Sequence, residues 1–345
     1  MATISHSRPQ RLPQFELLRI VAMFFVVLNH VIGDGLDIYG SFSVNTSTSS
    51  GFLAWTLLQI LKLIPLVGVN LFVLITGYFT IDRQAFRVKG IWRVWSTVWL
   101  YAVSIYLICS AIGVVPFTWQ DLLREATPLL SNSYWFVTSY IILMLFAPLI
   151  SRVIAHATHT HYVILLTVGG IICFQPLLGQ YIMDNQMIIL FVYLYMIGGY
   201  IRKFHHDRTI KSSYLLLSIA TILLVMFLYT LYKNRVTGSD DYKVFSMTYY
   251  GLVLPLSVAV FLYARNWRIN HDVLRKAILI VAPLSFSAYI IESQSVIHVL
   301  LYDNLKTVLL SIPPILLPIA CISFTTVIYG FCILIDYLRV KVCRF

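Results

Sequence analysis

The sequence predicts an all-α, polytopic integral membrane protein with about ten transmembrane helices. Of its 345 residues, 59% are hydrophobic and only 11% are charged, whereas soluble domains carry about 25% charged residues. The mean hydropathy of the chain is +0.83. This composition excludes a soluble globular domain, a disordered chain and a disulfide-rich scaffold.

Ten apolar runs are bounded by charged or polar clusters and are long enough to cross a hydrocarbon core. They are residues 15–33, 57–80, 93–113, 134–154, 162–178, 186–201, 213–232, 246–264, 277–299 and 308–337. Pro65 and Gly68 interrupt the second run, and three prolines lie near the start of the last. We expect one domain over residues 1–345, with tails at 1–14 and 338–345. Between the third and fourth runs, residues 116–133 include Asp121 to Glu125, for which we expect a short interfacial helix.

The distribution of positive charge predicts the orientation of the chain. The chain has 25 Lys and Arg against 14 Asp and Glu. With the N-terminus in the cytoplasm, 19 of the 25 basic residues fall on the cytoplasmic side of the ten runs. The positive-inside rule therefore places both termini in the cytoplasm of a cell-membrane protein. It also explains the basic balance without a nucleic-acid partner.

The first apolar run carries three ionisable side chains, Glu16, Arg19 and His30. Each such group costs about 2.5–3.5 kcal/mol on insertion scales, which makes it a candidate functional residue. The eleven-residue step from Arg19 to His30 keeps both within about 20° of one helix face, about 16 Å apart. Glu16 is expected to pair with Arg19 at three-residue spacing. The alternatives are snorkelling of Glu16 and Arg19 to the inner surface, and a carbonyl hydrogen bond for His30.

Four further polar residues lie in or beside the apolar runs. Asn70 is expected either in the site or in a helix-to-helix hydrogen bond. Lys89 and Arg93 begin the third run, where they either bind phosphate or anchor the helix at the inner surface. Glu292 lies within an apolar run, so we expect it to face the protein interior, paired or functional.

Several common chemical motifs are absent from the sequence. There is no CxxC pair, GxSxG, GxGxxG or Walker sequence, so a nucleophile-elbow esterase or an ATP-driven pump is not supported. The loop histidines show no zinc spacing. We therefore expect no metal and no tightly bound cofactor.

The residues from Glu16 to His30, with ten residues between Arg19 and His30, resemble the first-helix signature of the integral-membrane acyltransferase 3 family. Three later segments agree with the family in order. They are residues 70–79, residues 89–93, and residues 134–140 followed by Pro148. The similarity extends from about residue 11 to residue 340. One position departs from the pattern, because Glu292 follows Tyr289-Ile-Ile where relatives commonly have His. His298 lies six residues further along and cannot occupy the same point on one helix.

The resemblance implies transfer of an acyl group, most often acetyl, from cytoplasmic acyl-CoA. The acceptor would be a hydroxyl of a cell-surface carbohydrate or of a lipid-linked precursor. It implies that Arg19, oriented by Glu16 and helped by Lys89 and Arg93, holds the anionic donor, and that His30 acts as general base or as nucleophile. Residues expected to line the pore or contact the acceptor are Asn70, Tyr134, Trp135, Tyr289 and Glu292. For Tyr134 and Trp135 the alternative is an interfacial aromatic belt.

Two other functions fit the composition and the topology. One is a non-enzymatic flippase or secondary transporter of a glycolipid or saccharide, which would use the same intramembrane polar residues as a pathway. The other is an acyltransferase-like protein retained for sensing or scaffolding, which the departure at Glu292 favours slightly. The acceptor, the acyl chain length and the oligomeric state do not follow from the sequence.

Overall fold

The computed structural model describes residues 11–38, 42, 44, 46–131, 133–174, 187–237 and 251–342, and within these ranges it contains helices and turns but no strands. The first half of the chain forms α1 (Pro13–His30), the π-helical η1 (Val31–Gly35), α2 (Ser49–Leu63), the 3₁₀ turn η2 (Ile64–Val67), α3 (Gly68–Thr80), α4 (Val88–Ala111), α5 (Trp119–Ala126), α6 (Trp135–Ala155) and α7 (His159–Phe174). The second half forms α8 (Met187–His205), α9 (Ser212–Thr237), α11 (Val253–Arg265), α12 (Asp272–Val281), α13 (Ser285–Glu292), α14 (Ser295–Leu310), η4 (Pro314–Leu316) and α15 (Leu317–Val342).

The helical, multi-pass character expected from the sequence is confirmed. Within the described ranges, eight helical segments are long and apolar enough to cross a membrane. Two of the predicted runs correspond to shorter apolar helices, His159–Cys173 and Val253–Arg265. Residues 175–178 and 246–250 of those runs lie outside the described residues. The short helix expected between residues 116 and 133 is α5.

The predicted helix over residues 277–299 is wrong in its extent. The span instead covers Asp272–Glu292, formed by α12 and α13, and α14 is a separate helix that begins at Ser295. The last break comes at Gln294, whose backbone is extended at φ −62° and ψ 133° and whose side chain accepts hydrogen bonds from the N–H groups of Val296 and Ile297. This N-cap starts α14 in a new direction. The final span also begins later than predicted, because α14 continues to Leu310 and the helix resumes only at Pro314.

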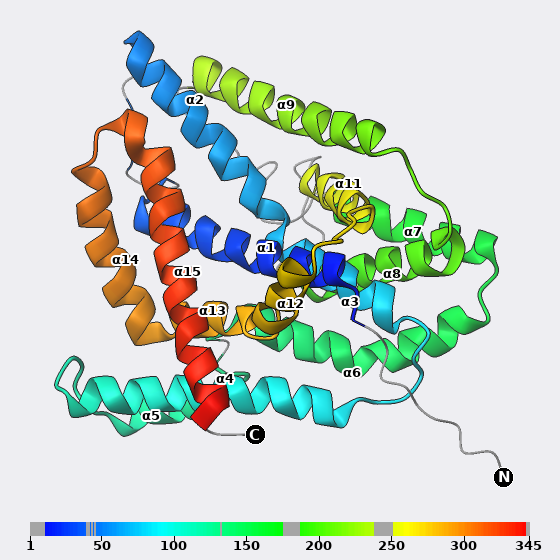
Figure 1. Cartoon of the computed structure of the whole chain (residues 1–345), viewed down its shortest axis with the longest axis horizontal. Helices are drawn as coiled ribbons and strands as arrows, with labels where there is room; N and C mark the ends of the chain where they lie inside the picture. The colour runs from blue at the N-terminus through cyan, green and yellow to red at the C-terminus, as the bar shows by residue number, and fades with distance from the viewer. Residues whose placement is uncertain are drawn as a thin grey trace.

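Helix α1 lies at the centre of the molecule, with α2 and α9 along one edge and α4 and α5 along the opposite edge (Figure 1). It packs against α3, α11, α13 and α15. Its first turn is held by aromatic contacts, because the Phe15 ring lies 5.2 Å from the Tyr78 ring and 5.0 Å from the Phe79 ring of α3. The beginning of α1 is therefore next to the end of α3.

Glycines let the backbones of neighbouring helices come close. A Cβ atom on Gly68 would lie 2.7 Å from the carbonyl oxygen of Ala22, so only glycine allows α3 to begin directly against α1. Gly77 of α3 meets the backbone of Tyr195, and Gly198 of α8 meets the carbonyl oxygen of Leu74. This reciprocal use of small residues is typical of helices that pack inside a membrane.

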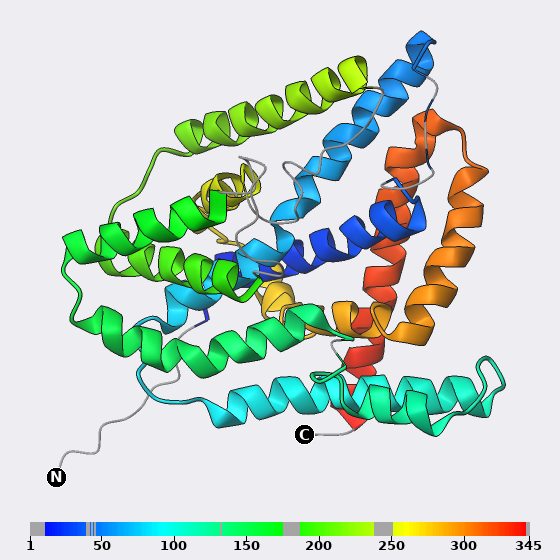
Figure 2. The ribbon, with the colours of Figure 1, turned by 180° about the vertical axis from the view of Figure 1, so that it is seen from behind.

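The outer helices present apolar side chains to the surroundings. Only 17% of the most apolar stretch of α9, and 22% of the corresponding stretch of α15, is buried inside the protein. Large exposed side chains on these helices include Leu217, Leu224, Val327 and Phe331. Figure 2 shows α9 along the outer edge of the molecule from behind. Exposed apolar faces of this extent are expected of helices in contact with lipid.

Candidate functional site

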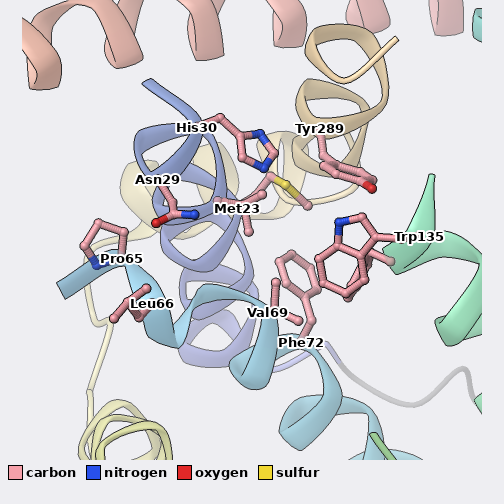
Figure 3. A pocket seen from close by; sticks show the side chains of 11 residues that line it. Met23, Asn29, His30, Pro65, Leu66, Val69, Phe72, Trp135 and Tyr289 are labelled. Carbon is pink, nitrogen blue, oxygen red and sulfur yellow. The ribbon is translucent and has the colours of Figure 1, made fainter. Parts of the chain in front are cut away.

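A small pocket lies beside the last two turns of α1. We call it the His30 pocket (Figure 3). Its lining residues come from α1, η2, α3, α6 and α13, and they are Met23, Val26, Asn29, His30, Pro65, Leu66, Val69, Phe72, Trp135, Phe136 and Tyr289. His30 and Tyr289 lie on one side of it, and Val69 and Phe72 lie on the opposite side. A mostly apolar pocket with one convergent imidazole is a candidate reaction site.

His30 pairs with Glu292, the acid within the apolar run at residues 277–299. Its Nδ1 lies 2.7 Å from Oε1 of Glu292 at the end of α13. The Glu292 carboxyl group is completely buried, whereas the His30 side chain keeps 20% of its surface exposed. A buried carboxylate needs partners, and His30 is one of them.

Two further donors complete the surroundings of Glu292. The Ser293 hydroxyl donates to Oε1 at 2.8 Å and the Tyr302 hydroxyl donates to Oε2 at 2.9 Å. With both oxygens accepting hydrogen bonds, the carboxyl group is suited to the ionised, acceptor-only form. The Nδ1 atom of His30 then carries the proton that it donates to Glu292, and Nε2 is the basic nitrogen.

A second, roomier pocket lies at the junction of α3, α4 and α6. We call it the basic pocket because Arg83 and Arg87 line it. Partial burial and the neighbouring Arg87 charge both lower the pKa of the Arg83 guanidinium. Two like charges on one pocket wall favour an anionic occupant, because an anion relieves their repulsion and pairs with both.

Helices α3 and α6 line both pockets. Phe72 and Phe136 belong to the His30 pocket, whereas Thr80 and Tyr140 belong to the basic pocket. The helical rise places Thr80 about 12 Å beyond Phe72 and Tyr140 about 6 Å beyond Phe136. The two pockets therefore follow one another along a single seam between these helices.

Two contacts lie between the pockets along the seam, one between hydroxyl groups and one between aromatic rings. The Thr76 hydroxyl lies 3.1 Å from the Tyr140 hydroxyl across the two helices. The Tyr140 ring stacks on the Phe136 ring with 5.8 Å between centroids. Thr76 also donates to the Phe72 carbonyl oxygen, which keeps its hydroxyl close to the helix.

A family comparison agrees with the sequence resemblance. The model of the acyltransferase 3 family, described as an acyltransferase domain, matches residues 12–334. The chain belongs to this family. Among curated proteins and among solved structures, no significant match was found. As a member of the acyltransferase 3 family, the protein is a multi-pass membrane acyltransferase.

The first-helix signature of this acyltransferase lies where the spacing predicts. Nη1 of Arg19 is 2.7 Å from Oε1 of Glu16, which is the ion pair expected at three-residue spacing. Arg19, Met23, Val26 and His30 follow one another at intervals of four, three and four residues along the continuous α1 helix. This spacing puts Arg19 on the same stripe as the α1 residues of the His30 pocket, toward the end nearer the basic pocket.

Lys89 and Arg93 do not line either of these two pockets, and both are exposed. The residues of α4 that line the basic pocket are Gly90, Ile91 and Val94. Sequence reasoning missed Arg83 and Arg87 as site residues and counted them only toward orientation. A signal was present, because Arg87, Ile91 and Val94 recur at helical spacing at the start of α4.

The other expected site residues divide into two groups. Trp135 and Tyr289 line the His30 pocket. Asn70 is buried and donates to the Ser257 hydroxyl at 3.1 Å, which joins α3 to α11. Tyr134 is also fully buried, and its hydroxyl donates to the carbonyl oxygen of Ile290. Asn70 and Tyr134 thus lie behind the walls of the His30 pocket.

Proposed function

We propose that the protein transfers an acyl group, most simply acetyl, from acyl-CoA to a hydroxyl of an extracytoplasmic or lipid-linked carbohydrate. The observation that carries this proposal is the His30–Glu292 pair, at 2.7 Å, at one end of a seam whose other end is the basic pocket. Such a seam suits a donor with an anionic head and a long, thin arm that ends in a reactive thioester. Coenzyme A thioesters have this shape and charge.

The basic pocket suits the phosphate groups of the donor. Arg83 and Arg87 supply guanidinium groups, which pair strongly with phosphate oxygens. The pantetheine arm would then pass between α3 and α6, which requires the 3.1 Å contact between the Thr76 and Tyr140 hydroxyls to open. Arg19 adds positive charge along the same route, while Glu16 fixes its orientation.

The chemistry at His30 follows from which nitrogen is held by Glu292. Nε2 takes the proton of the acceptor hydroxyl, whose oxygen attacks the thioester carbonyl carbon. The new C–O bond forms and the C–S bond breaks, so that the products are an ester and coenzyme A. Alternatively, Nε2 itself takes the acyl group first and passes it to the hydroxyl. In both routes Glu292 holds the imidazole in the reactive tautomer.

The acceptor side of the proposal rests on the aromatic wall of the His30 pocket. Trp135 and Tyr289 present rings and polar edges to the space next to His30. Aromatic faces of this kind bind the apolar face of a sugar ring. By the positive-inside rule, the basic pocket would face the cytoplasm of a cell-membrane protein, as would both termini. The His30 pocket would then lie nearer the extracytoplasmic side.

Labelled acetyl-CoA tests the proposal directly. Membranes that contain the wild-type protein are expected to transfer label to carbohydrate, and membranes with His30→Ala at equal abundance are not. His161→Ala serves as the matched control, because His161 is exposed at the start of α7. Equal labelling by the wild type and His30→Ala would refute the role of His30. Transport of an unmodified glycolipid without labelling would favour the flippase function.

A further inference from the structure

A row of ionisable side chains extends from His30 toward the end of the molecule away from the basic pocket. After the 2.7 Å contact between His30 and Glu292, Nδ1 of His298 lies 4.0 Å from Oε2 of Glu292. Nε2 of His298 in turn lies 3.6 Å from Oδ2 of Asp34. Imidazole and carboxyl groups therefore alternate from the reaction pocket outward.

Exposure increases along this row. The side chain of Glu292 is fully buried, that of His298 is 33% exposed and that of Asp34 is 49% exposed. Asp34 lies beyond the end of α1, whereas Phe15 at the beginning of α1 contacts the end of α3 near the basic pocket. The row thus joins the buried pair to solvent on the side opposite the donor.

Two irregularities of the backbone assemble the row. The first is η1, where α1 widens into a π-helix directly after His30 and carries Asp34. The second is the break at Gln294, which starts α14 in a new direction. On one continuous helix, His298 would lie about 240° around the axis from Glu292. Because the helix breaks, His298 instead returns to the same carboxyl group.

Several other side chains surround the row. The Tyr302 hydroxyl donates to Glu292, and its ring contacts the His298 ring at 4.6 Å. Lys306 of α14 forms an ion pair with Asp37 at 2.9 Å, next to the row. The Tyr289 ring of α13 lies 6.3 Å from the His30 ring, and the Cys332 thiol of α15 is buried. Within the described residues, His298 is the only group that bridges Glu292 and Asp34 in this way.

We propose that Glu292, His298 and Asp34 form a proton path between His30 and the solution on the side opposite the basic pocket. This inference rests on the proposed acyl transfer. The path would supply a way to restore His30 after each transfer without returning the proton through the donor seam.

The proton balance of the reaction defines the task of the path. The acceptor hydroxyl gives its proton to Nε2 of His30, and the departing coenzyme A thiolate takes up a proton from the donor-side solution, so each transfer consumes one proton on the donor side and releases one on the other side. His30 passes its Nδ1 proton to Glu292, from which it moves to His298, to Asp34 and to solvent. Each imidazole gains a proton on one nitrogen, releases one from the other, and regains its starting tautomer by a turn of the ring. The 3.6 and 4.0 Å steps are spanned by a bridging water or a small rotation.

The test uses the full chain in proteoliposomes, with labelled acetyl-CoA on the donor side and a carbohydrate acceptor on the other. The pH of the Asp34 side is varied between about 6 and 8 while the donor side stays buffered. For the wild type, the transfer rate is expected to rise severalfold with that pH, because proton release becomes easier. For His298→Gln and Asp34→Asn, we expect a rate about tenfold lower that no longer follows that pH. Asp303→Asn removes an exposed charge from the same helix and is expected to behave as the wild type.

Chemical rescue separates proton transfer from a structural role. Imidazole added on the Asp34 side is expected to restore the rate of His298→Ala and to leave the wild-type rate unchanged. The path is overturned if the His298 and Asp34 variants keep the wild-type pH profile. It is equally overturned if His298→Ala loses activity that imidazole does not restore. A wild-type protein that transfers no label under any condition would instead refute the acyl transfer on which the path rests.

Discussion

At the scale of single residues, the site depends on one buried carboxylate. Glu292 is completely buried, yet both of its oxygens accept hydrogen bonds, from His30, Ser293 and Tyr302. A buried acid is costly unless it is paired in this way. The pairing orients the His30 imidazole for the reaction, because a carboxylate at Nδ1 leaves Nε2 as the base.

Glu292→Gln keeps the size of the side chain but replaces an acceptor oxygen with an amide. The amide can donate to Nδ1 of His30 and select the wrong tautomer. We expect kcat to fall by about 10²- to 10⁴-fold with little change in protein abundance. Tyr302→Phe removes one of the other two donors and is expected to lower kcat by less than about tenfold. Steady-state transfer kinetics check this, and wild-type kcat in Glu292→Gln would contradict it.

Arg87→Gln tests the donor pocket. We expect the KM for acyl-CoA to rise about tenfold while kcat changes little, because the lost contact is to phosphate groups remote from the reacting carbon. Arg93→Gln, on the exposed face of α4, is expected to have a smaller effect on KM. Lys211→Gln, an exposed basic residue before α9, serves as the charge-matched control. A KM that Arg87→Gln leaves unchanged would exclude the basic pocket as the phosphate site.

At the scale of helices, local sequence patterns predict most of the helices, but they do not predict which residues pair over long distances in the chain. The apolar runs predict most of the spans, and three-residue spacing predicts the contact between Glu16 and Arg19. The contact between His30 and Glu292 joins residues 262 positions apart, which no spacing rule can find. The sequence argument that His298 cannot reach the position of Glu292 assumes one continuous helix. The N-cap at Gln294 breaks that helix, so the argument does not hold.

Gly77 tests the close packing of α3 on α8. A Cβ atom there would overlap the backbone of Tyr195, which cannot move away as a flexible side chain would. We therefore expect Gly77→Ala to lower the free energy of unfolding by about 1–3 kcal/mol. Gly330→Ala is the matched control, because nothing lies within 4 Å of a Cβ atom at that glycine. The thermal unfolding midpoints of the solubilised variants decide the matter, and equal midpoints would argue against tight packing at Gly77.

At the scale of the whole molecule, the proposed reaction uses both sides of a membrane through a single chain. Helices α3 and α6 line both the basic pocket and the His30 pocket, and α1 carries Arg19 and His30 along the same direction. On the proposed function, the donor thioester and the acceptor hydroxyl would meet at His30 without either molecule crossing the bilayer. The helices around this centre present apolar faces outward, as a membrane requires.

Transfer between separated compartments tests whether donor and acceptor meet at His30 from opposite sides of the membrane. Proteoliposomes would hold labelled acetyl-CoA on the side of the basic pocket only and the carbohydrate acceptor on the opposite side only. We expect labelled acceptor with the wild-type protein and no labelled acceptor with His30→Ala. Product that forms only when donor and acceptor share one compartment would contradict a passage that joins the two sides at His30.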